Sequence, residues 1–218
     1  MARWTVFNLQ DGLGEHAQEW DALNQRKFKN HPMLDSRFVN GLLWHFGGKS
    51  ECLCVLKKAD QAEAMCLLRH DQFSRWTTFL PSQAQLGPGQ VFEALLSGFA
   101  ATGNAMVYEL WFGRQLAASR LVISSNEMVV MVKTTYAEEL ARFAPGRLLL
   151  RQVVEHLFTL CPGSVIEFYT NASVDQLAWA TGQREIRHIS FYTDSFTAGI
   201  FNFLRNFRNR FLSPSAPR

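Results

Sequence analysis

Residues 128–136 read Met-Val-Val-Met-Val-Lys-Thr-Thr-Tyr, and residues 144–150 read Ala-Pro-Gly-Arg-Leu-Leu-Leu. The first stretch is rich in β-branched and apolar residues, which predicts a strand. The second places Pro-Gly ahead of an apolar run, which predicts a turn and then a helix. A strand that leads through a turn into a helix exposes backbone N–H groups that no carbonyl of the helix can reach. We therefore expect the fold to be organised around residues 128–158.

The turn ahead of this helix is suited to an anion. Free backbone amides and the positive end of the helix dipole both favour a phosphate or a carboxylate. Arg142 and Arg147 lie on either side of the turn and would add two permanent positive charges. The alternative interpretation is an ordinary turn that starts a core helix.

The composition is that of an ordinary globular protein. The 218 residues are 47% apolar and 19% charged, which is enough for one sizeable core or two small ones. The formal net charge of +3, without a long block of Lys or Arg, gives no reason to expect nucleic-acid binding. No run reaches the roughly 18 apolar residues of a membrane span, and the N-terminus lacks a signal-peptide core. We expect a cytoplasmic protein.

The cysteines predict buried, reduced thiols and no metal site. There are four, at positions 52, 54, 66 and 161. The pattern Cys52-Leu53-Cys54 places two thiols on one face of a strand. A zinc site including His45 or His70 would need ligand pairs at turn spacing, which the sequence does not offer there.

Periodicity along the chain predicts a mixed α/β fold. Helices are expected over residues 15–26, 37–46, 91–101, 147–160 and 175–181. Strands are expected over residues 4–7, 51–58, 62–69, 76–80, 106–112, 116–124, 128–133, 164–170 and 187–193. Gly87-Pro88-Gly89 is the strongest interruption of the pattern. It divides an N-terminal half, residues 1–88, from a C-terminal half, residues 89–195, and a tail, residues 196–218.

Residues 136–150, Tyr-Ala-Glu-Glu-Leu-Ala-Arg-Phe-Ala-Pro-Gly-Arg-Leu-Leu-Leu, carry a family resemblance. They resemble the Y-D-x-x-x-A-x-x-S-P-G-x-L-L-L segment of GNAT-type acyltransferases in the CelD-like branch. That branch is associated with bacterial cellulose and exopolysaccharide synthesis and is related to the Fem peptidyl transferases. The resemblance extends over residues 108–192, and a shorter match covers residues 81–87. It implies a GNAT fold, with a mixed, mostly antiparallel sheet flanked by helices.

The resemblance also implies a co-substrate, acetyl-CoA or another acyl-CoA. Its pyrophosphate and pantetheine would be received by the Pro-Gly turn and the helix after it. The residues implied in binding are Arg142, Ala144, Gly146, Arg147 and Leu148. The implied function is acyl transfer to a small-molecule amine, with an amino sugar in exopolysaccharide biosynthesis as the candidate acceptor.

Transfer to an amine needs donors that polarise the thioester carbonyl, and often a base for the ammonium and an acid for the thiolate. The predicted catalytic residues are Glu167, His188 and Tyr136, and Tyr169 and Tyr192 are further candidates.

Glu167 is the main candidate for the base. Alternation along the strand places it, with Tyr169, on the face opposite Ile166 and Phe168. Burial on a central strand would raise the pKa of Glu167, as a base requires. The alternatives are that Glu167 faces solvent or pairs with Arg184 or Arg187, and that His188 is a structural histidine.

Two departures from the resembled family favour a second function. Related transferases carry a lysine in a Y-K pair, whereas residues 171–177 here contain none. Larger members also carry a segment between the two halves, which the Gly87-Pro88-Gly89 linker replaces. The alternative is therefore a catalytically inactive GNAT-fold module that binds a partner in a polysaccharide-synthesis complex.

The C-terminal tail predicts a basic amphipathic helix from Phe196 to Phe211. Its apolar stripe and the arginines beside it are Phe196, Ile200, Phe203, Leu204, Phe207, Phe211, Arg205, Arg208 and Arg210. Such a helix either docks on its own domain, lies on an anionic membrane such as the inner membrane face, or occupies a partner's groove.

Overall fold

The computed structural model describes residues 3–70, 75–79, 89–169, 174–186, 189–193 and 199. The chain forms two compact units. The first contains Met1–Gln10, Gly47–Leu80 and Ile186–Arg218, and the second contains Asp11–Phe46 and Pro81–Glu185. These units interleave along the chain. The division into residues 1–88, 89–195 and 196–218 stays a prediction.

The first unit contains an antiparallel sheet with the strand order β1-β2-β3-β4-β9. Its strands are β1 (Arg3–Asn8), β2 (Glu51–Lys58), β3 (Gln61–His70), β4 (Arg75–Thr78) and β9 (Ser190–Tyr192). Strands β2 and β3 form the predicted hairpin, which turns at Ala59 and Asp60 with φ of 50° and 62°. Two consecutive positive φ angles give the tight turn that matches strand twist.

The core of the first unit includes a buried carboxylate. Leu53 and Val55 are fully buried on β2 beside Glu51. Glu51 accepts hydrogen bonds from Arg69 Nε at 2.6 Å and from the Gly48 amide. These donors satisfy a charge that would otherwise be costly to bury. Cys52 and Cys54 on the same strand are buried as expected, but Cys161 is exposed, which contradicts the prediction for that residue.

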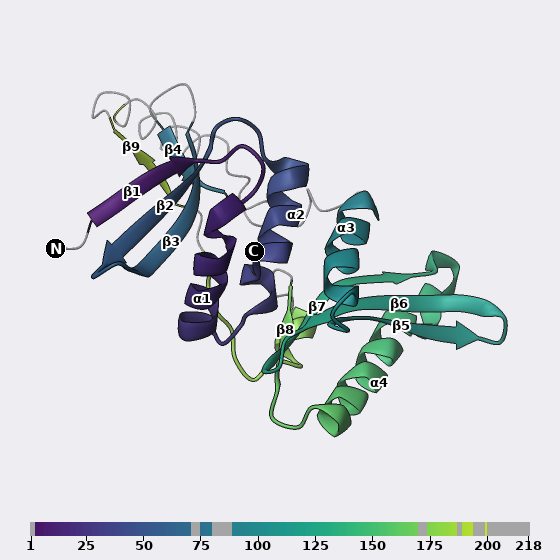
Figure 1. The fold of residues 1–218 in the computed structure, drawn as a ribbon. Coiled ribbons are helices and arrows are strands. Elements are labelled where there is room, and N and C mark those ends of the chain that lie inside the picture. The colour runs from purple at the N-terminus through teal and green to yellow at the C-terminus, as the bar shows by residue number, and fades with distance from the viewer. Residues whose placement is uncertain are drawn as a thin grey trace. The chain divides into compact units, whose positions relative to one another are not determined.

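The second unit contains a four-stranded sheet and most of the helices (Figure 1). The strands are β5 (Ala105–Phe112), β6 (Gln115–Ser124), β7 (Met128–Tyr136) and β8 (Val165–Phe168). The α-helices are α1 (Ala17–Phe28), α2 (Ser36–Phe46), α3 (Gly89–Ala100), α4 (Pro145–Leu160) and α5 (Val174–Leu177). Short 3₁₀ turns are η1 (Gly14–His16), η2 (Pro32–Leu34) and η4 (Glu138–Phe143).

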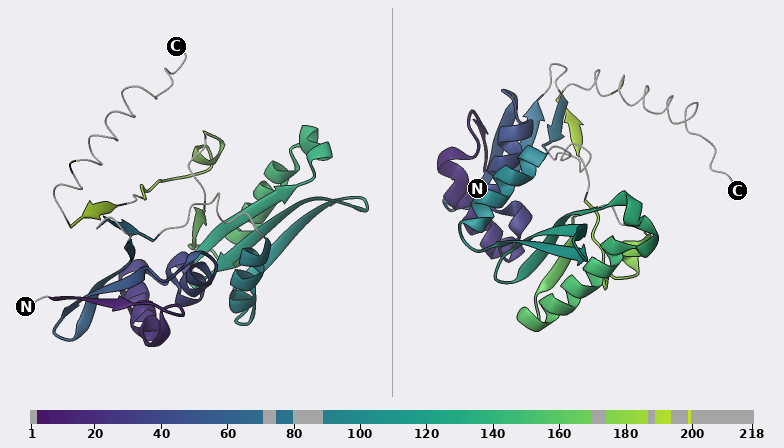
Figure 2. Two further views of the ribbon diagram at one scale, coloured as in Figure 1. Left: turned by 90° about the horizontal axis from the view of Figure 1, so that it is seen from above. Right: turned by 90° about the vertical axis from the view of Figure 1, so that its right-hand side faces the viewer.

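Strands β5, β6 and β7 are antiparallel, and β8 pairs parallel to β7. A parallel pair needs a crossover connection, which α4 supplies. Helix α4 lies along one face of this sheet (Figure 2). Its buried residues Leu149, Leu150, Val153 and Leu157 pack against side chains of β6 and β7 and include Ile166 and Phe168 of β8 in their contacts.

The predicted fold class is confirmed: the sheets are mostly antiparallel and helices flank them. The predicted amphipathic helix from Phe196 to Phe211 lies outside the described residues. Over the part of the chain that the structure describes, no helix has the length and apolar character needed to cross a membrane. Within that same part, no three His, Cys, Asp or Glu side chains are grouped as a metal site would require.

Candidate functional site

Strand β7 pairs with β8 over only part of its length. The parallel register runs from Met128–Val165 to Met131–Phe168, and the Tyr169 amide donates to the Met131 carbonyl at 3.1 Å. Strand β7 continues for five further residues to Tyr136. Among the described residues, no strand pairs with that edge of residues 132–136. As far as the structure describes the chain, residues 132–136 therefore form an edge without a strand partner, the open edge of β7.

A bulge lies where this pairing ends. Val122 of β6 is opposite Met131, but the next residue back, Leu121, is opposite Lys133. Val132 is therefore an extra residue on β7. A bulge bends its strand and increases the local twist, and this one coincides with the point at which β8 stops following β7. The bulge also shifts the alternation, so that Thr134 and Tyr136 lie on the face covered by α4.

Helix α4 begins beside the open end of β7. Ala144 precedes the helix with left-handed φ and ψ of 49° and 48°, and Pro145 is the first helical residue. The alanine side chain cannot cap the helix, and the Ala144 carbonyl already accepts from the amides of Arg147 and Leu148. The Gly146 amide has no carbonyl of the described chain to donate to. An uncapped helix start of this kind favours anions.

The helix start and the end of strand β7 lie side by side. A Cβ atom at Gly146 would lie 3.7 Å from Tyr136 Cδ1 and 3.8 Å from Thr134 Cγ2. Tyr136 is half exposed at the end of the strand. The end of β7 that carries Thr134 and Tyr136 therefore lies beside the first turn of α4.

The other residues predicted to bind the co-substrate lie around the same turn. Arg147 and Leu148 are exposed on the first turn of α4. Arg142 lies in η4 just ahead of the turn, with its guanidinium carbon 4.6 Å from the centre of the Phe143 ring. The structure brings the five residues together, and their binding role stays a prediction.

A second cluster lies on the opposite face of the sheet from α4. Ile166 and Phe168 pack with α4, so Glu167 of β8 points away from that helix, as alternation predicted. Glu167 Oε2 is 3.0 Å from His31 Nε2. Arg184 Nη2 donates to Glu167 Oε1 and also lies against His31 Nε2. One carboxylate is thus held by an imidazole and a guanidinium.

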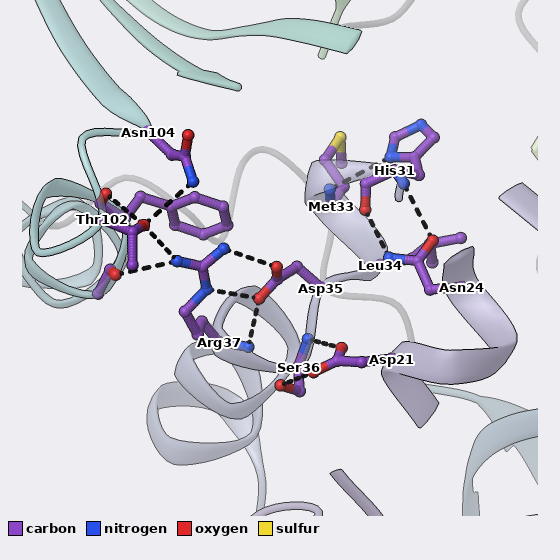
Figure 3. Close-up of polar contacts among 12 residues, drawn as sticks. Asp21, Asn24, His31, Met33, Leu34, Asp35, Ser36, Arg37, Thr102 and Asn104 are labelled. Carbon is purple, nitrogen blue, oxygen red and sulfur yellow. Dashed lines mark hydrogen bonds and ion pairs between the residues drawn. The ribbon is translucent and has the colours of Figure 1, made fainter. Parts of the chain in front are cut away.

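The loop between α1 and α2 fixes His31 (Figure 3). The buried Asn24 side chain holds the His31 backbone from both sides, accepting from its amide and donating to its carbonyl, each at 3.0 Å. The Met33 amide donates to His31 Nδ1 at 3.2 Å. Because Nδ1 accepts, Nε2 carries the proton and donates to Glu167.

The predicted rise in the pKa of Glu167 is wrong. Burial raises the pKa of this carboxyl, but the hydrogen bond from His31, together with the charge and hydrogen bond of Arg184, brings it below its ordinary value. Moreover β8 is an edge strand, not a central one. Glu167 is therefore an ionised acceptor, and the alternative prediction of a pair with Arg184 agrees with the structure.

The remaining candidate catalytic residues lie on different parts of the chain. Tyr169 packs edge-on against Phe38 with ring centres 6.2 Å apart, and burial raises the pKa of its hydroxyl. Tyr192 lies on β9 in the first unit. His188 and Arg187 lie outside the described residues.

Sequence reasoning missed His31. Its position before Pro32, between two helices, marked only a break in the helical pattern. It is separated from Glu167 by 136 positions, and no local spacing relates the two.

Comparison with known families agrees with this geometry. Residues 45–172, more than half of the chain, match the family model of the acetyltransferase (GNAT) domain. The chain therefore belongs to the GNAT acetyltransferase family. Domains of this family indicate acyl transfer in general and generally use an acyl-CoA as co-substrate. Neither the curated proteins nor the solved structures gave a match.

Proposed function

We propose that this protein is an acyl-CoA-dependent N-acyltransferase that binds its co-substrate along β7 and at the start of α4. The observation that carries the proposal is the coincidence of the Val132 bulge, the open edge of residues 132–136 and the uncapped start of α4 at one place. The family membership supports the reaction class.

The two parts of a coenzyme A molecule fit the two parts of this site. Pantetheine is an extended chain with two amides, which can add to an unpaired strand edge as a peptide does. The pyrophosphate is an anion for the helix start, where Arg142 and Arg147 supply charge. The bulge would then lie beside the thioester, at the end of the site away from the phosphates.

The acceptor is proposed to be a small-molecule amine. An ionised Glu167 with a lowered pKa is poorly suited to removing a proton from the ammonium form of this amine. The resemblance to the CelD-like branch supports an amino sugar in exopolysaccharide biosynthesis as the acceptor. The tail from Phe196 to Phe211 would hold such an enzyme at the inner membrane face or on a partner protein.

Isothermal titration with acetyl-CoA tests the proposal. The wild-type protein is expected to bind, and Arg147→Glu is expected to weaken binding by tenfold or more because it places an anion at the helix start. Arg151→Glu is the matched control, since Arg151 is exposed one turn further along α4 and pairs with Glu155. No heat from folded wild-type protein at millimolar ligand would reject the proposal.

One observation favours a second candidate, a GNAT-fold module that binds acyl-CoA without catalysis. Glu167 is occupied by His31 and Arg184, so the main candidate for a base is not available in this arrangement. The missing lysine of the Y-K pair also favours a module without catalysis. Release of free coenzyme A in the presence of an amine panel would reject this second function, provided that Arg147→Glu abolishes the release.

A further inference from the structure

Arg120 on β6 is a buried cation that has no anionic partner among the described residues. Only 7% of its surface is exposed. Its Nη1 donates to the Met131 sulfur at 3.3 Å, and its Nε has no hydrogen-bond partner among the described residues. Burial lowers the pKa of the guanidinium to about 10, so the side chain remains charged at neutral pH. A thioether is a weak acceptor, and it does not compensate a charge.

Arg120 lies on the face of the sheet that α4 covers. Its neighbours on that face of β6, Ala118 and Val122, pack in the same cluster as the first turns of α4. Directly opposite on β7 is Thr134, whose methyl group is next to Gly146 at the helix start. By strand and helix spacing, the guanidinium lies on the order of 10 Å from the first amides of α4.

The positive charge of Arg120 is unfavourable near the start of α4. The N-terminal end of a helix is its positive pole, so a nearby cation increases the positive potential there. A buried charge without a partner is destabilising by itself. An anion at the start of α4 would interact favourably with the helix dipole and with the Arg120 guanidinium. Arg120 is therefore a buried charge that the described residues do not neutralise.

We propose that Arg120 acts as a fixed positive charge inside the core that strengthens binding of the phosphate groups of a nucleotide-bearing co-substrate at the start of α4. The inference rests on the proposed function. Arg120 touches no ligand and acts through its field as a positioning residue. With an effective dielectric constant of about 20 and a separation of about 10 Å, Coulomb's law predicts a contribution of about tenfold to the affinity.

The test compares two ligands and three variants. Coenzyme A carries the phosphates and pantetheine lacks them, so a field effect acts on the first ligand alone. The neutral variants are Arg120→Met and Arg120→Gln, and Arg120→Lys keeps the charge. Affinity is measured by calorimetry at low and at raised salt, and stability by urea unfolding.

The neutral variants are expected to bind coenzyme A about tenfold more weakly, to bind pantetheine as the wild type does, and to be at least as stable. Arg120→Lys should keep most of the affinity for coenzyme A. Equal losses for both ligands, or no loss for either, would overturn the inference and leave the proposed function standing. Failure of both neutral variants to fold would overturn it as well, because the guanidinium would then be stabilising the core. A wild type that binds no coenzyme A would reject the proposed function and, with it, this inference.

Discussion

Replacing Glu167 with glutamine removes one negative charge and keeps a group that can accept from His31. The variant therefore measures how much the negative charge of Glu167 contributes to the free energy of unfolding. His31 is 3% exposed and Glu167 21%, so their hydrogen bond is well shielded. Hydrogen bonds to charged groups contribute roughly 1.5–3 kcal/mol, part of which a neutral amide retains. Arg184 is 52% exposed, so screening reduces its share to below about 1 kcal/mol.

These contributions predict that Glu167→Gln lowers the free energy of unfolding by about 1–2 kcal/mol at pH 7. The folded-state pKa of Glu167 lies below the ordinary value of 4.5. The stabilisation is therefore fully present above pH 4.5 and is lost as the pH falls through the lowered folded-state pKa. The difference between variant and wild type should shrink in that acidic window.

Urea unfolding between pH 7 and pH 3 measures both effects. Glu155→Gln is the matched control: Glu155 forms an exposed ion pair with Arg151 on α4, and its loss should change stability by less than about 0.5 kcal/mol. Equal stability of Glu167→Gln and wild type at pH 7 would refute the account of this cluster. A difference that stays constant down to pH 3 would also refute it, because the charge would then not be its source.

Three further predictions concern other parts of the chain. Asn24→Ala should lower the free energy of unfolding by about 2–4 kcal/mol in urea, since it leaves the buried amide and carbonyl of His31 unpaired. Cys161 is exposed, whereas burial raises the pKa of Cys54 to about 11, so a thiol reagent should show one fast phase that Cys161→Ser removes. Full-length protein should sediment with anionic vesicles at low salt, and truncation after Asp194 should abolish this; unchanged vesicle binding with loss of folding would instead place the tail in the core.

The organisation of the second unit was predictable because its signals are local. An apolar strand, a Pro-Gly pair and an apolar helix follow one another within about 30 residues, and each has its own chemical signature. The predicted start of this helix is wrong. The sequence predicts a turn at Pro145 and Gly146 and a helix from Arg147, but α4 begins at Pro145. Proline is well suited to the first helical position, and the turn is made by the left-handed Ala144.

The features that the sequence could not supply depend on distant parts of the chain. The bulge at Val132 lies in a run of five apolar residues, where no alternation reveals an extra residue. The contact of His31 with Glu167 depends on the packing of the α1–α2 loop. The pKa of Glu167 was predicted with the wrong sign because burial was considered without the hydrogen bond from His31 and the positive charge of Arg184. Strand β9 completes a sheet whose other strands lie more than 100 positions earlier.

Hydrogen exchange of backbone amides with and without acetyl-CoA tests the central claim most directly. The account predicts that the ligand slows exchange at residues 132–136 of β7 and at Gly146. The paired part of β7, residues 128–131, and the hairpin β2–β3 of the first unit should be unchanged. Binding that leaves residues 132–136 and Gly146 unprotected would contradict the account, because the co-substrate would then occupy a different site.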